Sequence, residues 1–283
     1  MSFQYQNRYF KPNIQPTIFS ISSPHELSNT YAKIEYFDST GSHKDRESRK
    51  IVEYCRKNNI NAVGCASTGN FGISSSAHCK MAGIERHVLI STSINTVKQH
   101  LLELQDAIIH KVNAIGKEIY EVSNTKMSEM GIYNANPGQC FLKVAANKSI
   151  GYEINVLFGN DLDYIICPAN NGTLLRGVWL GLREKGAKAK MVGAVAKNSS
   201  IASSISGNLE FDDPASVYKQ SQGFEINLTD QQISDVHNTL LSMGIFCEPS
   251  SAASLAAAKI LNSENQSLTT RIICIITGCG LKK

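Results

Sequence analysis

The feature that most constrains the fold of this chain is a regular alternation of short apolar runs with segments of helical periodicity. Apolar runs long enough for buried strands lie at 60–66, 88–91, 164–167, 191–196 and 271–277. Strands that are apolar on both faces are typical of parallel sheets with helices on both sides. The sequence therefore predicts an α/β fold with mostly parallel sheets.

The stretches between these runs carry weaker signals. One helix is expected over 94–110, because four apolar residues recur there at helical spacing: Val97, Leu101, Leu104 and Ile108. The segment 111–140 is expected to be less regular, and 198–224 to be an irregular connection. No internal repeat or low-complexity linker is visible, so a second domain is expected as an insertion rather than in tandem.

Composition excludes several classes of function. The 283 residues are 42% hydrophobic and 18% charged, as in ordinary globular proteins. The net charge of +4 is spread over the chain, and no basic run exceeds Lys282–Lys283, so nucleic-acid binding is not supported. Segment 1–13 lacks the apolar core of a signal peptide, and no stretch approaches a membrane span. We expect a cytoplasmic protein without a membrane partner.

The 8 cysteines are spread along the chain without any Cys-x-x-Cys pair. Metal-ligand spacing is therefore absent, and no metal site is predicted. Several cysteines lie inside apolar runs, as Cys167 and Cys274 do. They are expected to be small buried hydrophobic residues in a reducing compartment.

The most informative local motif is the heptapeptide Thr40–Arg46, which reads Thr-Gly-Ser-His-Lys-Asp-Arg. Lys44 follows a tight Gly-Ser turn between a predicted strand and a predicted helix, where its amine is placed to form an imine with pyridoxal 5'-phosphate. Burial would depress the pKa of this amine, which could then also shuttle protons. The alternative is a surface lysine at a solvated helix start, since Lys44–Glu47 alternates charges.

A second motif, Ser-Thr-Gly-Asn, lies where another strand passes into a helix. The hydroxyls of Ser67 and Thr68, with backbone N–H groups around Gly69, suit a substrate carboxylate. The side chain of Asn70 can donate toward a phenolate oxygen such as the 3′ oxygen of the cofactor. The alternative is an ordinary helix N-cap with a turn of small residues.

A third motif repeats this arrangement after the strand 164–167. Its Asn and Gly residues tolerate positive φ, and the following helix directs its positive end at the loop. Backbone donors and one hydroxyl there suit a phosphate monoester. The residues concerned are Asn170, Asn171, Gly172, Thr173 and Leu174. The Gly-Lys-Ser/Thr element of a nucleoside-triphosphate loop is missing.

The final apolar strand ends in Thr277-Gly278-Cys279-Gly280. Thr277 can offer a neutral hydroxyl to a pyridine nitrogen, and a hydroxyl, unlike an aspartate, does not hold that nitrogen protonated. Such a site favours elimination and replacement chemistry. The alternative is a strand that simply ends in a glycine turn.

Together these motifs, with Glu248–Ala253 (Glu-Pro-Ser-Ser-Ala-Ala), resemble in type and order the fold type II pyridoxal-phosphate enzymes, and most of all the threonine synthases. The resemblance covers about 30–282. It implies a two-domain architecture like that of the tryptophan synthase β subunit, with the cofactor between the domains, and a homodimer. It makes Lys44 the Schiff-base lysine, Asn70 the partner of the 3′ oxygen, Asn171–Leu174 the phosphate loop and Thr277 the partner of the ring nitrogen. Ser67 and Thr68 match the loop that binds the substrate carboxylate.

The chain departs from that family pattern in ways that bear on the substrate. His43 replaces the usual aromatic residue before the lysine. Its ring either places a titratable group beside the imine, and so beside the substrate, or packs away from the cofactor ring. Threonine synthases carry an Asn-Pro-x-Arg-like element whose arginine helps to hold the substrate phosphate. Here Asn136–Gln139 has no arginine, and the candidates to replace it are Lys143 and Lys148.

The sequence thus predicts a smaller inserted domain at 52–137 and a larger cofactor-binding domain formed by 1–51 and 138–283. The predicted activity is a lyase or transferase that acts on an amino acid, like threonine synthase. The alternatives are a serine/threonine dehydratase, a β-replacement enzyme similar to cysteine synthase, and a binding protein of the same fold without turnover. A nucleotide-binding protein is a more distant alternative.

Overall fold

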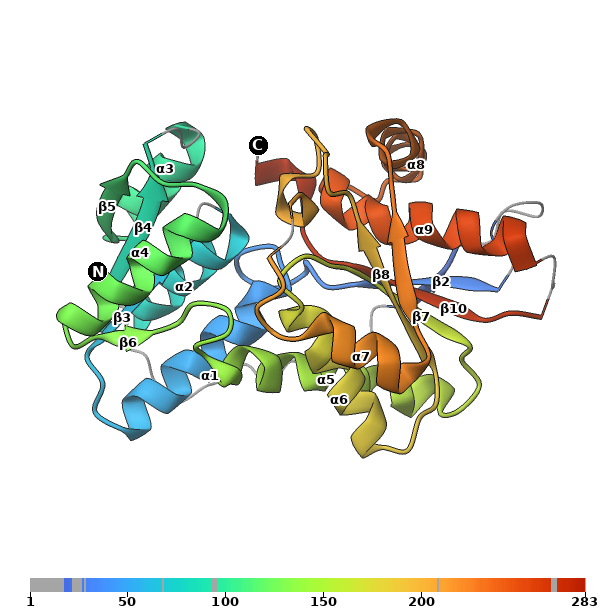
Figure 1. Cartoon of the computed structure of the whole chain (residues 1–283), viewed down its shortest axis with the longest axis horizontal. Coiled ribbons are helices and arrows are strands. Elements are labelled where there is room, and N and C mark those ends of the chain that lie inside the picture. The colour runs from blue at the N-terminus through green and yellow to red at the C-terminus, as the bar shows by residue number, and fades with distance from the viewer. Residues whose placement is uncertain are drawn as a thin grey trace.

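In the computed structural model, which describes residues 18–21, 27, 29–67, 69–92, 96–207, 209–265 and 269–282, the chain forms two β-sheets flanked by helices (Figure 1). The larger sheet has six strands, parallel except for the antiparallel edge pair β1–β2. In spatial order the strands are β1 (Ile18–Ser20), β2 (Thr30–Ile34), β10 (Ile272–Ile276), β7 (Tyr164–Pro168), β8 (Lys190–Val195) and β9 (Phe224–Asn227). The predicted α/β class with mostly parallel sheets is confirmed.

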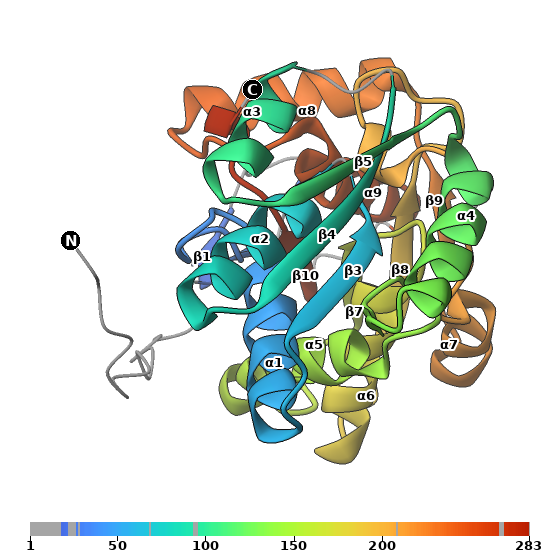
Figure 2. The ribbon, with the colours of Figure 1, turned by 90° about the vertical axis from the view of Figure 1, so that its left-hand side faces the viewer.

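The smaller sheet has four parallel strands from the middle of the chain. In spatial order they are β5 (Ile108–Val112), β4 (Glu85–Ser91), β3 (Ala62–Ala66) and β6 (Tyr133–Asn134). Figure 2 shows the helices α2 (Asn70–Ala82) and α3 (Thr96–Leu104) on one side of this sheet and α4 (Gly116–Glu129) on the other.

Helix α1 (Lys44–Lys57) connects the two halves, because it packs against α2 of the smaller half and against α5 (Phe141–Phe158) of the larger one (Figure 1). The helix runs through residue 52 without a break. The domain boundaries at 52 and 137 stay a prediction.

Two hydrophobic cores cover the faces of the larger sheet. Helices α8 (Asp230–Ser242) and α9 (Pro249–Asn265) pack on one face, and α5, α6 (Thr173–Glu184) and α7 (Pro214–Ser221) on the other. Strand β10 supplies both cores: Ile272, Cys274 and Ile276 face one, and Ile273 and Ile275 face the other. All five side chains are fully buried, which explains why this strand reads as a continuous apolar run.

Helix α6 approaches α5 at glycine positions. A Cβ atom added to Gly181 would lie 2.2 Å from the carbonyl oxygen of Lys148, and one added to Gly151 would lie 2.4 Å from that of Val178. A Cβ atom added to Gly177 would lie 2.4 Å from Cβ of Asn147. These distances are too short for any side chain, so only glycine permits the observed spacing of the two helices.

One predicted helix is wrong. The segment 94–110 is not a single helix, because α3 ends at Leu104 and the edge strand β5 begins at Ile108. A turn in which Asp106 adopts φ +55° separates the two elements. The segments 111–140 and 198–224 also contain regular structure, namely α4, β6, α7 and the 3-10 turn η1 (Ser203–Ile205).

All eight cysteines are free thiols. Seven of them are buried and Cys279 is partly exposed, in agreement with the expected role as small hydrophobic residues. Burial raises the pKa of the Cys55 thiol to about 12. In the part of the chain that the structure describes, no helix is long and apolar enough to cross a membrane.

Candidate active site

Three of the four predicted loops meet at the carboxyl ends of neighbouring strands in the larger sheet. Strands β2, β10 and β7 are parallel neighbours, so the segments that follow them leave from the same edge. The turn before Lys44 follows β2, Thr277 follows β10, and the Asn170–Leu174 loop follows β7. The backbone N–H of His43 donates to the carbonyl of Thr277 at 3.0 Å, which joins the first two segments.

Lys44 is the first residue of α1, and its amine is enclosed. The side chain is 16% exposed, and Nζ donates to Oε1 of Glu47 at 2.6 Å. Burial lowers the pKa of the Lys44 amine, with a further lowering from the charge of Lys143, while Glu47 opposes the change. The amine is therefore closer to its nucleophilic, neutral form than a surface lysine would be.

The alternative of a solvated helix start is not what the structure shows, since Asp45 and Glu47 are completely buried. The carboxylate of Asp45 accepts hydrogen bonds from the backbone N–H of Thr40 at 2.9 Å and from its hydroxyl at 2.7 Å. It also accepts one from the hydroxyl of Ser74 at 2.7 Å and lies 3.0 Å from Nε2 of His78. Burial would raise the pKa of Asp45, but these bonds outweigh it and lower the pKa to about 2. Asp45 thus fixes the turn that presents Lys44.

Arg46 anchors the same turn to the larger sheet. Its guanidinium group donates to Glu35 through Nε at 2.8 Å and to Glu153 at 2.6 and 2.9 Å. Lys33, near the end of β2, pairs with the same two carboxylates at 2.6 and 2.7 Å. Two cations and two anions therefore form one buried network below the lysine turn.

The Ser67–Asn70 loop lies at the end of β3, where α2 begins. Ser67 Oγ accepts a hydrogen bond from the backbone N–H of Gly72 at 2.9 Å, so this hydroxyl satisfies a backbone donor in the first turn of α2. The backbone N–H of Gly69 lies 3.4 Å from the same oxygen. Thr68 is outside the described residues. The side chain of Asn70 donates to both carboxylate oxygens of Glu248, at 3.1 and 2.9 Å.

The Asn170–Leu174 loop leads into α6 through a tight turn that is held by its own side chains. Gly172 has φ +84°, and Oδ1 of Asn171 accepts the backbone N–H of Thr173 at 3.1 Å. Asn170 turns away to the neighbouring connection, where its Nδ2 donates to the carbonyl of Ser206 at 2.8 Å. Leu174 is buried in the core beneath the loop. Asn170 therefore braces the loop through its side chain.

One acidic side chain at this loop has no counterpart among the predicted site residues. Asp212 is buried and accepts a hydrogen bond from the Thr173 hydroxyl. Its other carboxylate oxygen lies 3.3 Å from the backbone N–H of Gly138. Its backbone N–H donates to the carbonyl of Asn171 at 2.8 Å, so the segment crosses directly over the loop.

Thr277 lies at the end of β10 with its hydroxyl 2.9 Å from that of Ser251. Ser251 in turn accepts the backbone N–H of Gly278 at 2.9 Å. Nδ1 of His43 lies 3.4 Å from the Thr277 carbonyl, while its Nε2 is buried without a hydrogen-bond partner within the described residues. Burial, and next the charge of Lys44, lower the pKa of His43 to about 3, so the ring is neutral.

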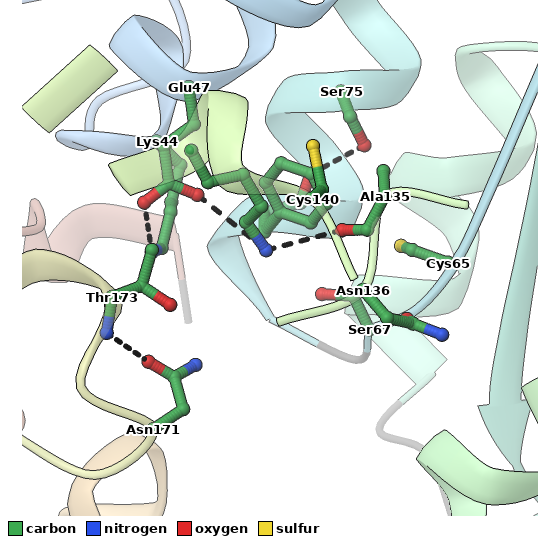
Figure 3. Close-up of polar contacts among 12 residues, drawn as sticks. Lys44, Glu47, Cys65, Ser67, Ser75, Ala135, Asn136, Cys140, Asn171 and Thr173 are labelled. Carbon is green, nitrogen blue, oxygen red and sulfur yellow. Dashed lines mark hydrogen bonds and ion pairs between the residues drawn. The ribbon is translucent and has the colours of Figure 1, made fainter. Parts of the chain in front are cut away.

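Sequence reasoning missed Glu47 and Asn147, and it gave no sign that Lys143 reaches Glu47 beside Lys44. Figure 3 shows Glu47 beside Lys44, with Thr173 and Asn171 on the adjoining loop. Both Lys143 and Asn147, from α5, reach Glu47: the Nζ–Oε2 distance is 3.7 Å, and Nδ2 donates to Oε1 at 2.9 Å. Helical spacing on α5 puts these two residues on one face, but nothing in the sequence pairs that face with Glu47.

The two lysines considered in place of the missing arginine differ in position. Lys143 is buried, with Nζ 3.8 Å from the centre of the Phe71 ring and 3.3 Å from the carbonyl of Ala135. Lys148 is on the outer side of α5 and pairs with Glu184 of α6 at 2.5 Å. Only Lys143 therefore adjoins the predicted site.

A model of the pyridoxal-phosphate dependent enzyme family matches residues 14–278. The chain belongs to this family. It is 25% identical to threonine synthase of Synechocystis sp., with 89% of this chain and 72% of the relative covered. It is 28% identical to threonine synthase of Methanocaldococcus jannaschii, with 90% and 71% covered. The crystal structure of cysteine synthase from Entamoeba histolytica superposes with a TM-score of 0.79 at 18% identity, and 100% of this chain and 91% of that one are covered.

The family depends on pyridoxal phosphate, and the residues of the site suit that group. An enclosed amine with a lowered pKa is present in Lys44. Gly172, in the left-handed region, immediately precedes α6. A Cβ atom added there would lie only 2.9 Å from Pro214, so the backbone of this loop stays uncovered by a side chain. A neutral hydroxyl, that of Thr277, lies at the end of β10. The carboxylate of Asp212, which accepts a hydrogen bond from the Thr173 hydroxyl, opposes an anionic phosphate group at this loop.

Proposed function

We propose that this chain is a pyridoxal-phosphate dependent lyase or transferase that acts on an amino acid by elimination or replacement, in the manner of threonine synthase. The observation that carries the proposal is the enclosed amine of Lys44, whose pKa is lowered, at the edge where the loops after β2, β10 and β7 converge. The relatives named threonine synthase support the choice of subfamily.

In this proposal each end of the cofactor has its own set of residues. Lys44 binds the aldehyde carbon, and Asn171, Gly172, Thr173 and Leu174 bind the phosphate, with Asn170 as the brace of their loop. Asn70 donates to the 3′ oxygen. Ser67, Gly69 and Thr68 form the loop for the substrate carboxylate, with His43 next to Lys44.

Lys44 and Thr277 have separate chemical roles in the proposal. Bound pyridoxal phosphate would supply an electron sink for negative charge on the substrate carbon. Lys44, when its amine is free, removes the α-proton at Nζ. Ser251 can donate to the hydroxyl of Thr277, which leaves the Thr277 proton available for the ring nitrogen. A hydroxyl partner keeps that nitrogen unprotonated, which favours loss of a leaving group.

One observation at the site favours a second candidate for the substrate. The Asn136–Gln139 segment offers no cationic side chain, and the amine of Lys143 lies against Glu47 and the Phe71 ring. A substrate without phosphate would need no such cation. The second candidate is therefore β-chemistry, as a serine/threonine dehydratase or as a β-replacement enzyme similar to cysteine synthase.

The experiment is a titration of the purified protein, loaded with pyridoxal phosphate, followed by visible absorbance. The ligands are O-phosphohomoserine, serine, threonine and O-acetylserine. A change with O-phosphohomoserine alone, with release of phosphate, supports the threonine synthase activity. A change with one of the other three supports the second candidate. A cofactor band that none of them alters supports a binding protein without turnover.

Lys44→Ala is the decisive variant for the lysine assignment, with Lys50→Ala on the same helix as its matched control. Lys50 is exposed and pairs only loosely with Glu53, at 3.6 Å. We expect Lys44→Ala to lose the borohydride-reducible cofactor band and Lys50→Ala to keep it. A band retained in Lys44→Ala would refute the assignment. The homodimer and the cytoplasmic location remain expectations, which size-exclusion chromatography and fractionation can test.

A further inference from the structure

A buried carboxylate beside the proposed cofactor lysine has no role in the function described so far. Glu47 lies one helical turn after Lys44 and is completely buried. A carboxylate in such a place is costly unless cations and donors surround it. The groups that surround Glu47 come from α1 and α5 alike.

Each carboxylate oxygen of Glu47 has its own surroundings. Oε1 accepts hydrogen bonds from Nζ of Lys44 at 2.6 Å and from Nδ2 of Asn147 at 2.9 Å. Nε2 of His43 lies 3.9 Å from this oxygen, too far for a hydrogen bond. Oε2 faces the amine of Lys143 at 3.7 Å and has no hydrogen-bond partner within the described residues. Glu47 is thus held from one side by α5 and itself holds Lys44 on the other.

The charges of Glu47 and Lys143 act in opposite directions on the amine of Lys44. Burial would raise the pKa of Glu47, but Lys44 and Lys143 outweigh it and lower the pKa to about 2, so the carboxylate is ionised. An ionised Glu47 stabilises the protonated form of Lys44, and the charge of Lys143 disfavours it. Asp212 also raises the pKa of Lys44, from the opposite loop.

We propose that Glu47 is a positioning residue that holds the free amine of Lys44, and that Lys143 is its counter-charge. The inference rests on the proposed function of Lys44. Whenever that amine is not bonded to the cofactor, Oε1 of Glu47 fixes its direction and Asn147 fixes Glu47. The balance between Glu47 and Lys143 sets the pH at which Lys44 becomes a free base.

The test is the pH dependence of Lys44 acylation by acetic anhydride, measured by peptide mass spectrometry on the full chain without added cofactor. In Glu47→Gln the amide oxygen can still accept from Asn147, but the negative charge is lost. The midpoint for Lys44 should then fall by about one pH unit, which is a tenfold change in the fraction of free amine. In Lys143→Met the midpoint should rise. Glu53→Gln, which changes a half-exposed carboxylate on the same helix, is the matched control and should leave the Lys44 midpoint unchanged.

A second readout, the pH dependence of the visible cofactor band on the loaded protein, separates this proposal from the function it rests on. If the wild type forms the band and neither variant moves the Lys44 midpoint, the positioning role is overturned while the proposed function stands. If the midpoints move in opposite directions but the wild type forms no band, the network holds and the proposed function fails. A shift in the same direction in both variants would also overturn the proposal, because it would indicate a general loosening around α1.

Discussion

The buried four-charge network below the lysine turn allows a sharp prediction for Lys33→Met. The network holds two cations, Lys33 and Arg46, against two anions, Glu35 and Glu153, and the Lys33 side chain is fully buried. Methionine fills a similar volume but leaves one guanidinium group for two carboxylates. The result is an uncompensated negative charge inside the protein.

Breaking a buried ion pair from one side costs about 3–5 kcal/mol. The Glu153 side chain is 23% exposed, so water partly screens the residual charge and the lower end, about 3 kcal/mol, is expected. For a chain of this length that corresponds to a fall in the melting temperature of roughly 5 °C. The expected loss is smaller than the total stability of a typical protein, so the variant should still fold.

Urea unfolding followed by tryptophan fluorescence measures the effect, because the single tryptophan, Trp179, lies in the core between α6 and the larger sheet. In the double variant Lys33→Met/Glu153→Gln, one cation, Arg46, remains for one anion, Glu35. This variant should recover at least half of the free energy of unfolding that Lys33→Met loses. Lys50→Met, which removes an exposed lysine, is the control and should change stability by less than about 0.5 kcal/mol. The reasoning fails if Lys33→Met costs less than about 1 kcal/mol, or if the double variant is no more stable than the single one.

The pH dependence of the same network follows from Glu153. Burial would raise its pKa, but the hydrogen bonds and charge of Arg46 outweigh burial and lower the pKa. A lowered carboxyl pKa gives stability that is present above the unfolded value of about 4.3 and lost as the pH falls below it. Below pH 5 the urea midpoint of Glu153→Gln should therefore fall less steeply with decreasing pH than that of the wild type. An equally steep fall in both proteins would contradict the argument.

Three further predictions concern other parts of the molecule. Asp212→Asn removes a negative charge from the Thr173 hydroxyl and should tighten pyridoxal phosphate binding by about tenfold, or about 1.4 kcal/mol, in a fluorescence titration; equal affinity would show that the carboxylate does not oppose the phosphate. The lowered pKa of His43 gives stability that is complete above its unfolded pKa of about 6.5 and falls toward about 3, so between pH 7 and 5 the wild type should lose up to about 2 kcal/mol that His43→Phe retains. Gly181→Ala puts a methyl group 2.2 Å from the carbonyl oxygen of Lys148 and should cost about 1–3 kcal/mol in urea unfolding, whereas a neutral result would mean that the two helices can separate freely.

The fold could be predicted because burial leaves a strong mark on the sequence. In β10 both faces are packed, and the continuous apolar run follows directly from that. The error at 94–110 has a local cause, since Leu101, Leu104 and Ile108 keep helical spacing across a turn that contains neither glycine nor proline. Only Asp106, in the left-handed region, marks the break, and aspartate tolerates that conformation without a clear sequence signal.

Within the candidate site, the arrangement that the sequence could predict is that of the loops after strands. The segments at Lys44, Asn171 and Thr277 follow strands that prove to be neighbours, so their convergence follows from the topology. Glu47 and Asp212 were not predictable, because their roles depend on what packs against them. Asp212 lies 39 residues from Thr173, and Glu47 belongs to a charged tetrapeptide that reads as a solvated helix start.

The close contact of α5 with α6 gives the proposed site a shared mechanical support. Helix α5 carries Lys143 and Asn147 toward the lysine end of the site, and the amino terminus of α6 carries Thr173 at the phosphate end. Because these glycines leave no room for a Cβ atom, α5 and α6 pack at a fixed close spacing, and a displacement of one helix is passed on to the other. Variation that enlarges a residue on this seam would therefore shift both ends of the site together, so the two ends are expected to evolve as a single unit.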